Sequence, residues 1–189
     1  TQGYGKMMVA ESWTQFETIK DYYGNGSDEF QMSFDFPRAG KIADVVNMST
    51  GAASGIIENY IKMEDEDYPA GYTAATFLCN HDLVASRPAT LYKNSEEKQI
   101  IAAALLLFLP GTPFMYYGNE IGMDDGNYDG DMKMRTAMEW KKVNEENSIL
   151  KKYMEFSAIR NERKSVRRGV FKRIYSNKTE LLLIEREYE

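Results

Sequence analysis

One stretch of sequence decides the fold: Thr73-Ala74-Ala75-Thr76-Phe77-Leu78-Cys79-Asn80-His81-Asp82. Its first part is a short, mostly apolar run that favours a buried strand, and the run stops at a histidine and an aspartate. The same arrangement occurs earlier, where the apolar run 6–10 stops at Glu11, and later, where the run 114–117 is followed by Glu120. Three predicted strands therefore end in polar groups that could carry out chemistry.

Helical patterns separate these runs. A fourth strand is predicted over residues 30–36, where apolar and polar residues alternate, and Pro37 ends it. Helices are predicted over residues 14–23 with Thr14 as N-cap, 39–48, 55–63, 96–109 with Asn94 or Ser95 as N-cap, and 149–159. Strands that alternate with helices in this way predict an α/β fold with a parallel sheet.

A parallel α/β fold predicts where the site lies. In parallel barrels the site forms at the carboxyl ends of the strands, so Glu11 and His81-Asp82 are expected at one edge. A doubly wound sheet would follow a similar rule, but no glycine-rich phosphate loop follows any predicted strand. At the end of the chain, residues 170–175 and 181–184 predict a β-hairpin around a turn at 176–178.

Composition excludes several classes of function. The formal net charge of −6 disfavours a nucleic-acid partner, because phosphate binding needs a basic face. The longest apolar run, residues 100–109, is too short to span a bilayer, which takes about 20 residues. Cys79 has no partner for an internal disulfide and is expected as a buried small hydrophobe. Cysteine usage alone does not determine the compartment, although a secreted or cell-surface location is favoured over a cytoplasmic one.

The candidate chemistry is that of carboxylates. The candidate acids are Glu11, Asp82, Glu120 and Asp35, and His81 is the one histidine. Sugar hydrolysis needs little more than two carboxyl groups that flank a glycosidic bond. A serine triad would need a G-x-S-x-G turn, and a zinc site would need several histidine or cysteine ligands; the sequence has neither. A structural role is favoured for Glu120.

An acidic loop offers a possible metal site. Residues 125–131 match the first half of an EF-hand-like calcium loop. Position twelve would be Thr136, which cannot supply the bidentate carboxylate, so a solvated acidic loop is favoured and no metal site is predicted.

Four segments carry a family resemblance. Phe77-Leu78-Cys79-Asn80-His81-Asp82 is similar to the F-L-x-N-H-D segment of the alpha-amylase family, glycoside hydrolase family 13. Ala10-Glu11-Ser12-Trp13 resembles its G-E-V-W segment, with Ala10 and Ser12 as the departures. Residues 111–123 resemble G-x-P-F-I-Y-Y-G-E-E-I-G-M, and residues 135–140 resemble R-T-P-M-Q-W, with Ala137 and Glu139 as departures. The four segments occur in the family's order and cover most of the chain.

The resemblance implies a role for each site residue. Glu11, at the end of the fifth barrel strand, would be the general acid/base in a partly desolvated pocket. Asp82, at the end of the seventh strand, would stabilise the positively charged, oxocarbenium-like sugar, and His81 would hydrogen-bond sugar hydroxyls. Trp13 and Tyr117 could stack against sugar rings, with simple burial as the alternative for each.

The resemblance also implies a partial (β/α)8 TIM barrel. Residues 1–166 would form strands five to eight with their helices, and residues 167–189 would begin a C-terminal β-sandwich domain. The family's aspartate nucleophile lies in a segment resembling G-x-R-x-D-A, which is absent here. The nucleophile, the first four strands and any calcium site are therefore expected upstream, and no cofactor is expected in this segment.

The implied function is retaining hydrolysis of alpha-glucosidic bonds in starch-like glucans or malto-oligosaccharides by the parent enzyme. A transglycosylase and a non-catalytic member that binds carbohydrate or protein are the alternatives, although retention of Glu11 and Asp82 argues against the latter. The sequence does not predict an oligomeric state.

The 189 residues alone are expected to be inactive and prone to aggregation, because half a barrel leaves open sheet edges and an uncovered core face. The measurement is release of reducing sugar from malto-oligosaccharides by the purified fragment. Any such release above that of a heat-denatured control would contradict the expectation.

Overall fold

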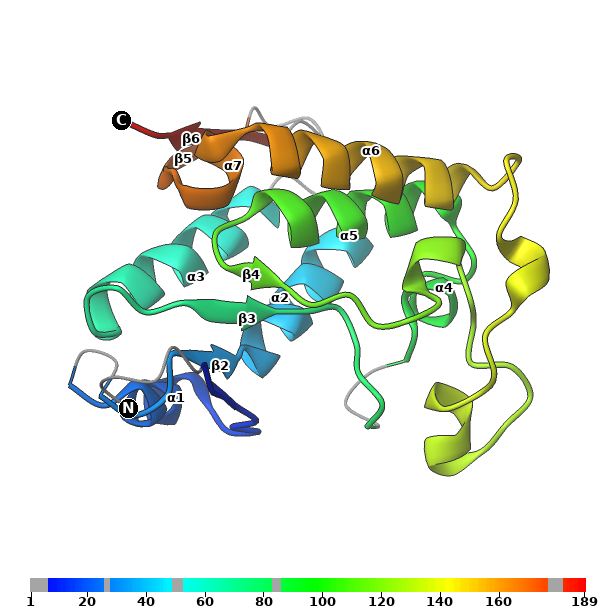
Figure 1. The fold of residues 1–189 in the computed structure, drawn as a ribbon, viewed down its shortest axis with the longest axis horizontal. Helices are drawn as coiled ribbons and strands as arrows, with labels where there is room; N and C mark the ends of the chain where they lie inside the picture. Colours follow the sequence, from blue (N-terminus) through cyan, green and yellow to red (C-terminus); the bar gives the residue numbers. More distant parts are fainter. Residues whose placement is uncertain (1–6, 26–27, 49–52, 83–85, 177–181) are drawn as a thin grey trace.

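A computed structural model describes residues 7–25, 28–48, 53–82, 86–176 and 182–189. Its centre is a four-stranded sheet in the order β1-β2-β3-β4, in which every neighbouring pair is parallel (Figure 1). The predicted α/β class with a parallel sheet is therefore confirmed. None of the described helices is long and apolar enough to cross a bilayer.

Strands and helices alternate along the chain. The strands are β1 Val9–Ala10, β2 Met32–Phe34, β3 Ala74–Thr76, β4 Thr112–Pro113, β5 Val170–Ser176 and β6 Leu182–Glu187. The α-helices are α1 Phe16–Tyr23, α2 Phe36–Asn47, α3 Ala53–Asp67, α4 Pro88–Leu91, α5 Glu96–Phe108, α6 Ser148–Glu162 and α7 Lys164–Arg168. Three 3₁₀ helices shape the segment between β4 and α6, namely η1 Asn119–Ile121, η2 Gly130–Met134 and η3 Trp140–Lys142.

Several element boundaries differ from the sequence prediction. Helix α2 begins at Phe36, not at residue 39, because a proline fits the first helical turn, where its missing N–H is not needed. Helix α1 begins at Phe16 behind Gln15, so Thr14 is not its N-cap. The prediction of a strand over 114–117 was wrong, since β4 is Thr112–Pro113 and the apolar residues follow it. Helix α4 was not predicted.

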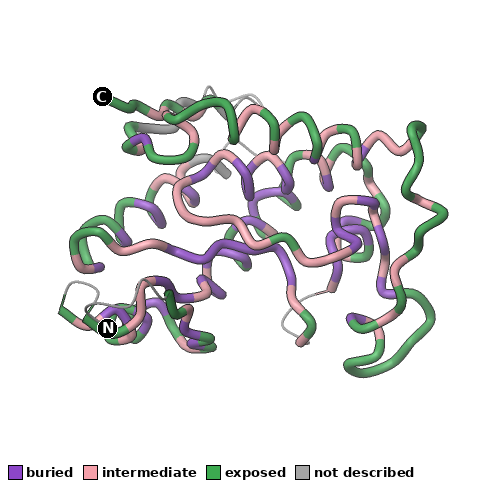
Figure 2. The backbone as a smooth tube through the Cα atoms, in the orientation of Figure 1, coloured by how far each residue is buried: buried purple, intermediate pink, exposed green. Residues whose placement is uncertain are grey.

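Helix α5 contributes to two hydrophobic clusters of the core. One face of α5 packs with α2 and α3 around Ile42, Ile61 and Leu106, and another packs against Ile149 and Tyr153 of α6. Figure 2 shows buried backbone through the strands and the inner helices, with exposed backbone along α6. Helix α5 is buried on two sides, as its mostly apolar sequence predicts, and Ser95 is its N-cap.

The C-terminal hairpin is confirmed as strands β5 and β6, which pair antiparallel. Its predicted turn over 176–178 lies largely outside the described residues. Phe171 and Ile184 pack against the main core, so the hairpin is attached to the helical layer.

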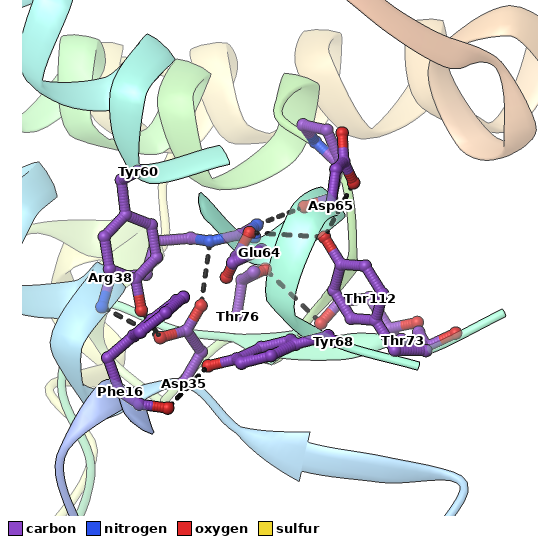
Figure 3. A network of polar contacts seen from close by, with 12 residues as sticks. Phe16, Asp35, Arg38, Tyr60, Glu64, Asp65, Tyr68, Thr73, Thr76 and Thr112 are labelled. Carbon is purple, nitrogen blue, oxygen red and sulfur yellow. Dashed lines mark hydrogen bonds and ion pairs between the residues drawn. The ribbon is translucent and has the colours of Figure 1, made fainter. Parts of the chain in front are cut away.

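A buried ionic network joins α2, α3 and the segment just before β4 (Figure 3). Arg38 lies 2.9 Å from Asp35 through Nε, pairs with Glu64 through Nη2 and donates from Nη1 to the carbonyl of Pro110 at 2.5 Å. All three charged residues are at most 2% exposed. The Tyr60 hydroxyl donates to Asp35 at 2.7 Å.

The charges of this network depend on one another. Burial raises the pKa of Glu64 well above its usual range, and the nearby Arg38 charge opposes that rise. Burial alone would lower the pKa of Arg38, but the carboxylates of Glu64 and Asp35 more than reverse this, so its pKa is raised. Arg38 is therefore a permanent buried cation whose carboxyl partners are Asp35, the N-cap of α2, and Glu64 of α3.

Replacing Arg38 with alanine should destabilise the complete protein by about 3–5 kcal/mol, because Asp35 and Glu64 would be buried without their counter-charge. The measurement is the shift in the chemical denaturation midpoint. Lys62→Ala is the control, because Lys62 forms an exposed ion pair with Glu58, worth about 1 kcal/mol or less. Equal, small losses in both variants would contradict the prediction.

Candidate active site

Glu11, His81 and Asp82 meet at the carboxyl end of the parallel sheet. Glu11 follows β1 directly, and His81 and Asp82 lie a few residues beyond β3. One polar atom from each of the three side chains lies within 4.8 Å of the other two. The structure thus brings together the three groups that the sequence predicted to share one edge, because parallel strands place their carboxyl ends on the same side.

Neighbouring hydrogen bonds fix the backbone that carries these groups. Ser12, which is buried directly after Glu11, hydrogen-bonds through its hydroxyl to Ser33 on β2. The backbone N–H of Asp82 donates to Asn80 Oδ1 at 3.0 Å, so Asn80 shapes the turn. The segment that holds Glu11 is therefore anchored to β2, and a local turn shapes the segment that holds Asp82.

The side chain of Arg135 bonds to the His81-Asp82 segment. Its Nη2 lies 2.9 Å from Asp82 Oδ1, and its Nε donates to the carbonyl of His81 at 3.2 Å. His81 Nε2 lies 3.5 Å from the same Asp82 oxygen. One carboxylate oxygen of Asp82 is thus oriented by a guanidinium and an imidazole. The sequence indicated Arg135 only through the segment 135–140 and did not show that it reaches Asp82.

The three groups remain open to solvent. Glu11 is exposed, and the side chains of His81 and Asp82 are 53% and 33% exposed. The described residues therefore do not form the partly desolvated pocket that a general acid needs. Two carboxylates and an imidazole at this spacing could also hold a divalent cation, but Arg135 already occupies one oxygen of Asp82.

The two aromatic candidates differ in their surroundings. Trp13 is 63% exposed, and its ring stacks parallel to Phe36 with the centroids 5.7 Å apart. Tyr117 is half-buried, and its hydroxyl donates to the carbonyl of Thr136. Trp13 has surface available for a sugar ring, whereas Tyr117 supports the segment that carries Arg135. Sugar stacking by either residue stays a prediction.

The buried Arg87 organises the loop beside the site. Its Nη1 donates to the carbonyl of Tyr117 at 2.6 Å and its Nη2 to that of Met134 at 3.0 Å. Its guanidinium lies over the rings of Tyr116 and Tyr117, with centroid distances of 5.0 and 4.8 Å. Arg87 therefore positions Met134, which directly precedes Arg135. The sequence places Arg87 five residues after Asp82 but does not reveal these contacts.

The other acidic candidates are not part of the group formed by Glu11, His81 and Asp82. Asp35 is the N-cap of α2 and part of the Arg38 network, so its role is structural. Glu120 lies in η1, where its Oε2 is buried and makes no hydrogen bond to the described residues. Asp125 accepts the backbone N–H of Arg87 at 2.8 Å and lies 3.6 Å from Lys133. Asp125 therefore anchors the backbone at Arg87.

Arg87→Lys should loosen the segment 116–136, because an ammonium cannot replace the planar two-pronged donor that bonds Tyr117 and Met134. Hydrogen exchange of the amides in this segment should become about tenfold faster or more. Lys133→Gln is the control, since Lys133 touches the same loop from a more exposed position at 3.6 Å from Asp125. Unchanged exchange in Arg87→Lys would contradict this account.

Comparison with known proteins identifies the family of this chain. Residues 2–169 match the model of the alpha-amylase catalytic domain. The chain is 29% identical to alpha-amylase 3 of Dictyoglomus thermophilum over 96% of its own length and 40% of that protein. It is 30% identical to trehalose synthase of Thermus thermophilus, covering 73% of this chain and 17% of that protein. The chain thus spans less than half the length of these relatives.

The fold agrees with solved structures. An alpha-amylase from Anoxybacillus superimposes with a TM-score of 0.80 at 23% identity, covering 97% of this chain and 39% of that one. The parallel sheet with its helices is thus part of a TIM-barrel architecture, in agreement with the predicted partial barrel. The matched catalytic domain, the shared fold and the convergence of Glu11, His81 and Asp82 lead to one conclusion: the chain belongs to the alpha-amylase family of glycoside hydrolases.

Proposed function

We propose that the protein carrying this chain hydrolyses alpha-glucosidic bonds in starch-like glucans or malto-oligosaccharides with retention of configuration. The observation that carries the proposal is the approach of Glu11, His81 and Asp82 to within 4.8 Å of one another at the carboxyl end of the sheet. Similarity to an alpha-amylase over 96% of the chain supports the same substrate class.

Glu11 is the proposed general acid/base. As the acid it donates a proton to the oxygen of the leaving sugar, and as the carboxylate it then takes a proton from the attacking water. Glu11 suits this role because it is exposed at the end of β1, where an incoming substrate can reach it. Substrate binding and the remainder of the barrel would supply the desolvation that the described residues do not provide.

Asp82 and His81 are proposed to hold the reacting sugar. An oriented carboxylate stabilises the positive charge that develops on the sugar ring, and an imidazole N–H donates to a sugar hydroxyl. The ion pair with Arg135 keeps one Asp82 oxygen in place, which avoids the cost of reorienting the carboxylate during the reaction. The exposed face of Trp13 is the proposed platform for a neighbouring sugar ring.

Parts of the proposed enzyme lie outside these 189 residues. The aspartate nucleophile of the retaining mechanism is proposed upstream, because no G-x-R-x-D-A segment is present. A calcium site formed by upstream residues is likewise a proposal. We also propose that residues 167–189 begin a C-terminal β-sandwich domain, with β5 and β6 as its first strands.

Transglycosylation is the second candidate function. It is favoured by the similarity to trehalose synthase at 30% identity. Water and a sugar hydroxyl would compete for the same covalent glycosyl intermediate, so the described groups serve either reaction. The ratio of reducing sugar to transfer products from malto-oligosaccharides distinguishes the two.

In the complete protein, Glu11→Gln should lower kcat/KM for malto-oligosaccharides by about 10²–10⁴-fold, because the amide cannot donate or accept the catalytic proton. The matched control is Glu17→Gln, an exposed acid in the first turn of α1, which should retain activity. A loss smaller than about tenfold in Glu11→Gln would refute the assignment of the general acid.

A further inference from the structure

A cavity lies at the opposite end of the sheet from Glu11 and Asp82. It has a volume of about 410 Å³ and is lined at its base by the amino ends of β3 and β4, including Thr73 and Thr112. Its other walls come from α6, α7 and the hairpin strands. The volume is within the usual range for small-molecule sites, roughly 300–1,000 Å³.

The lining of this cavity is strongly cationic. Among the described residues that line it are five of the nine arginines of the chain and one carboxylate, Asp65, and none of them is a lysine. The five are Arg38, Arg160, Arg167, Arg168 and Arg186. This concentration contrasts with a formal net charge of −6 for the whole chain. Arginine presents a planar set of donors that matches the oxygens of phosphate and carboxylate groups.

Most of these guanidiniums lack a carboxylate partner among the described residues. Arg160 donates to the carbonyls of Leu107 and Gly111 at 2.6 and 2.7 Å. Arg186 donates to the carbonyls of Phe108 and Gly169 at 2.9 and 2.7 Å. Neutral carbonyls satisfy the N–H groups but leave the positive charges uncompensated.

Arg38 differs from the other four, because its donors are committed to Asp35, Glu64 and Pro110. Its buried Nε, which makes no hydrogen bond to the described residues, lies 2.9 Å from Asp35, so the Arg38 charge is already paired within the fold. Arg167 and Arg168 are exposed at the rim, where their donors are accessible, and Arg160 retains its Nε. These three residues are the ones that could bond an anion directly.

The positive charges of the cavity lower one another's pKa values. Burial lowers the pKa of Arg160, and the nearby charge of Arg167 lowers it further. Burial also lowers the pKa of Arg186 to about 10, with further contributions from Arg160 and Arg38. Like charges held close in a partly buried site favour a bound counter-anion.

We propose that this cavity binds a small phosphate-bearing anion, held by Arg160, Arg167 and Arg168. A doubly charged oxyanion would compensate two of the four guanidiniums that lack a carboxylate partner among the described residues, and its oxygens suit their forked geometry. The cavity exceeds the size of a bare phosphate, so a phosphate monoester with an organic group of hexose size fits it.

Such a ligand would connect separate parts of the fold. Arg160 belongs to α6, Arg167 and Arg168 belong to α7, and Thr112 belongs to β4. An anion that bridges them would attach the hairpin region to the base of the sheet and would stabilise the folded state by mass action. The site is distinct from the proposed sugar site, because the two occupy opposite ends of the strands.

Isothermal titration calorimetry of the complete protein with inorganic phosphate and, separately, with a hexose monophosphate tests this proposal. Both anions are expected to bind, with the ester at least as tight, and the matching neutral hexose is expected not to bind here. Arg167→Gln combined with Arg168→Gln should weaken binding of both anions by about tenfold or more. Hydrolysis of malto-oligosaccharides by this variant reports that it is folded.

The matched control is Arg163→Gln. Arg163 is exposed between α6 and α7 but does not line the cavity, so its loss should leave anion binding unchanged. Absence of binding to the unaltered protein at about 10 mM phosphate and 10 mM ester would overturn the proposal. An equal weakening in Arg163→Gln would overturn it as well, because it would indicate a general charge effect instead of a site. Binding of ester but not phosphate supports a site for the monoester.

Discussion

The parallel pairing of four short strands is the constraint on which the rest of the structure depends. Residues such as Ser33 and Ala74, or Ala75 and Thr112, are in register, so all carboxyl ends face one side. Each strand is only two or three residues long and could not hold this register by its own hydrogen bonds. The helices must therefore supply the stability, and the two ends of the sheet are free to differ in chemistry.

Two buried arginines order irregular connections in different parts of the fold. Arg38 connects α2 and α3 to the chain segment before β4, and Arg87 connects the loop after β3 to the segment after β4. Both donate to backbone carbonyls of residues that lie outside the strands and α-helices. A guanidinium is suited to this task because it offers several donors in one plane and stays charged when buried. The irregular connections of the fold are thus ordered without long strands.

Most elements could be predicted because their signals are local. Helix α5 combines a capping Ser95 and acidic first-turn residues with an apolar sequence, and β3 is an apolar run ended by polar residues. The boundaries around Pro37 and over 114–117 could not be predicted in the same way. Proline suits both a strand end and a first helical turn, and an apolar run can lie beside a sheet without pairing in it. Tertiary packing decided between these alternatives.

By itself, the sequence determined the alternation of strands and helices, and the positions of Glu11, His81 and Asp82 after two of the strands. These features depend on residue type and on near neighbours along the chain. Only the tertiary structure decided that Arg135 reaches Asp82, that Asp35 belongs to the core, and that five arginines surround one cavity. Such contacts join residues far apart in sequence, and their geometry exists only once the helices have packed on the sheet.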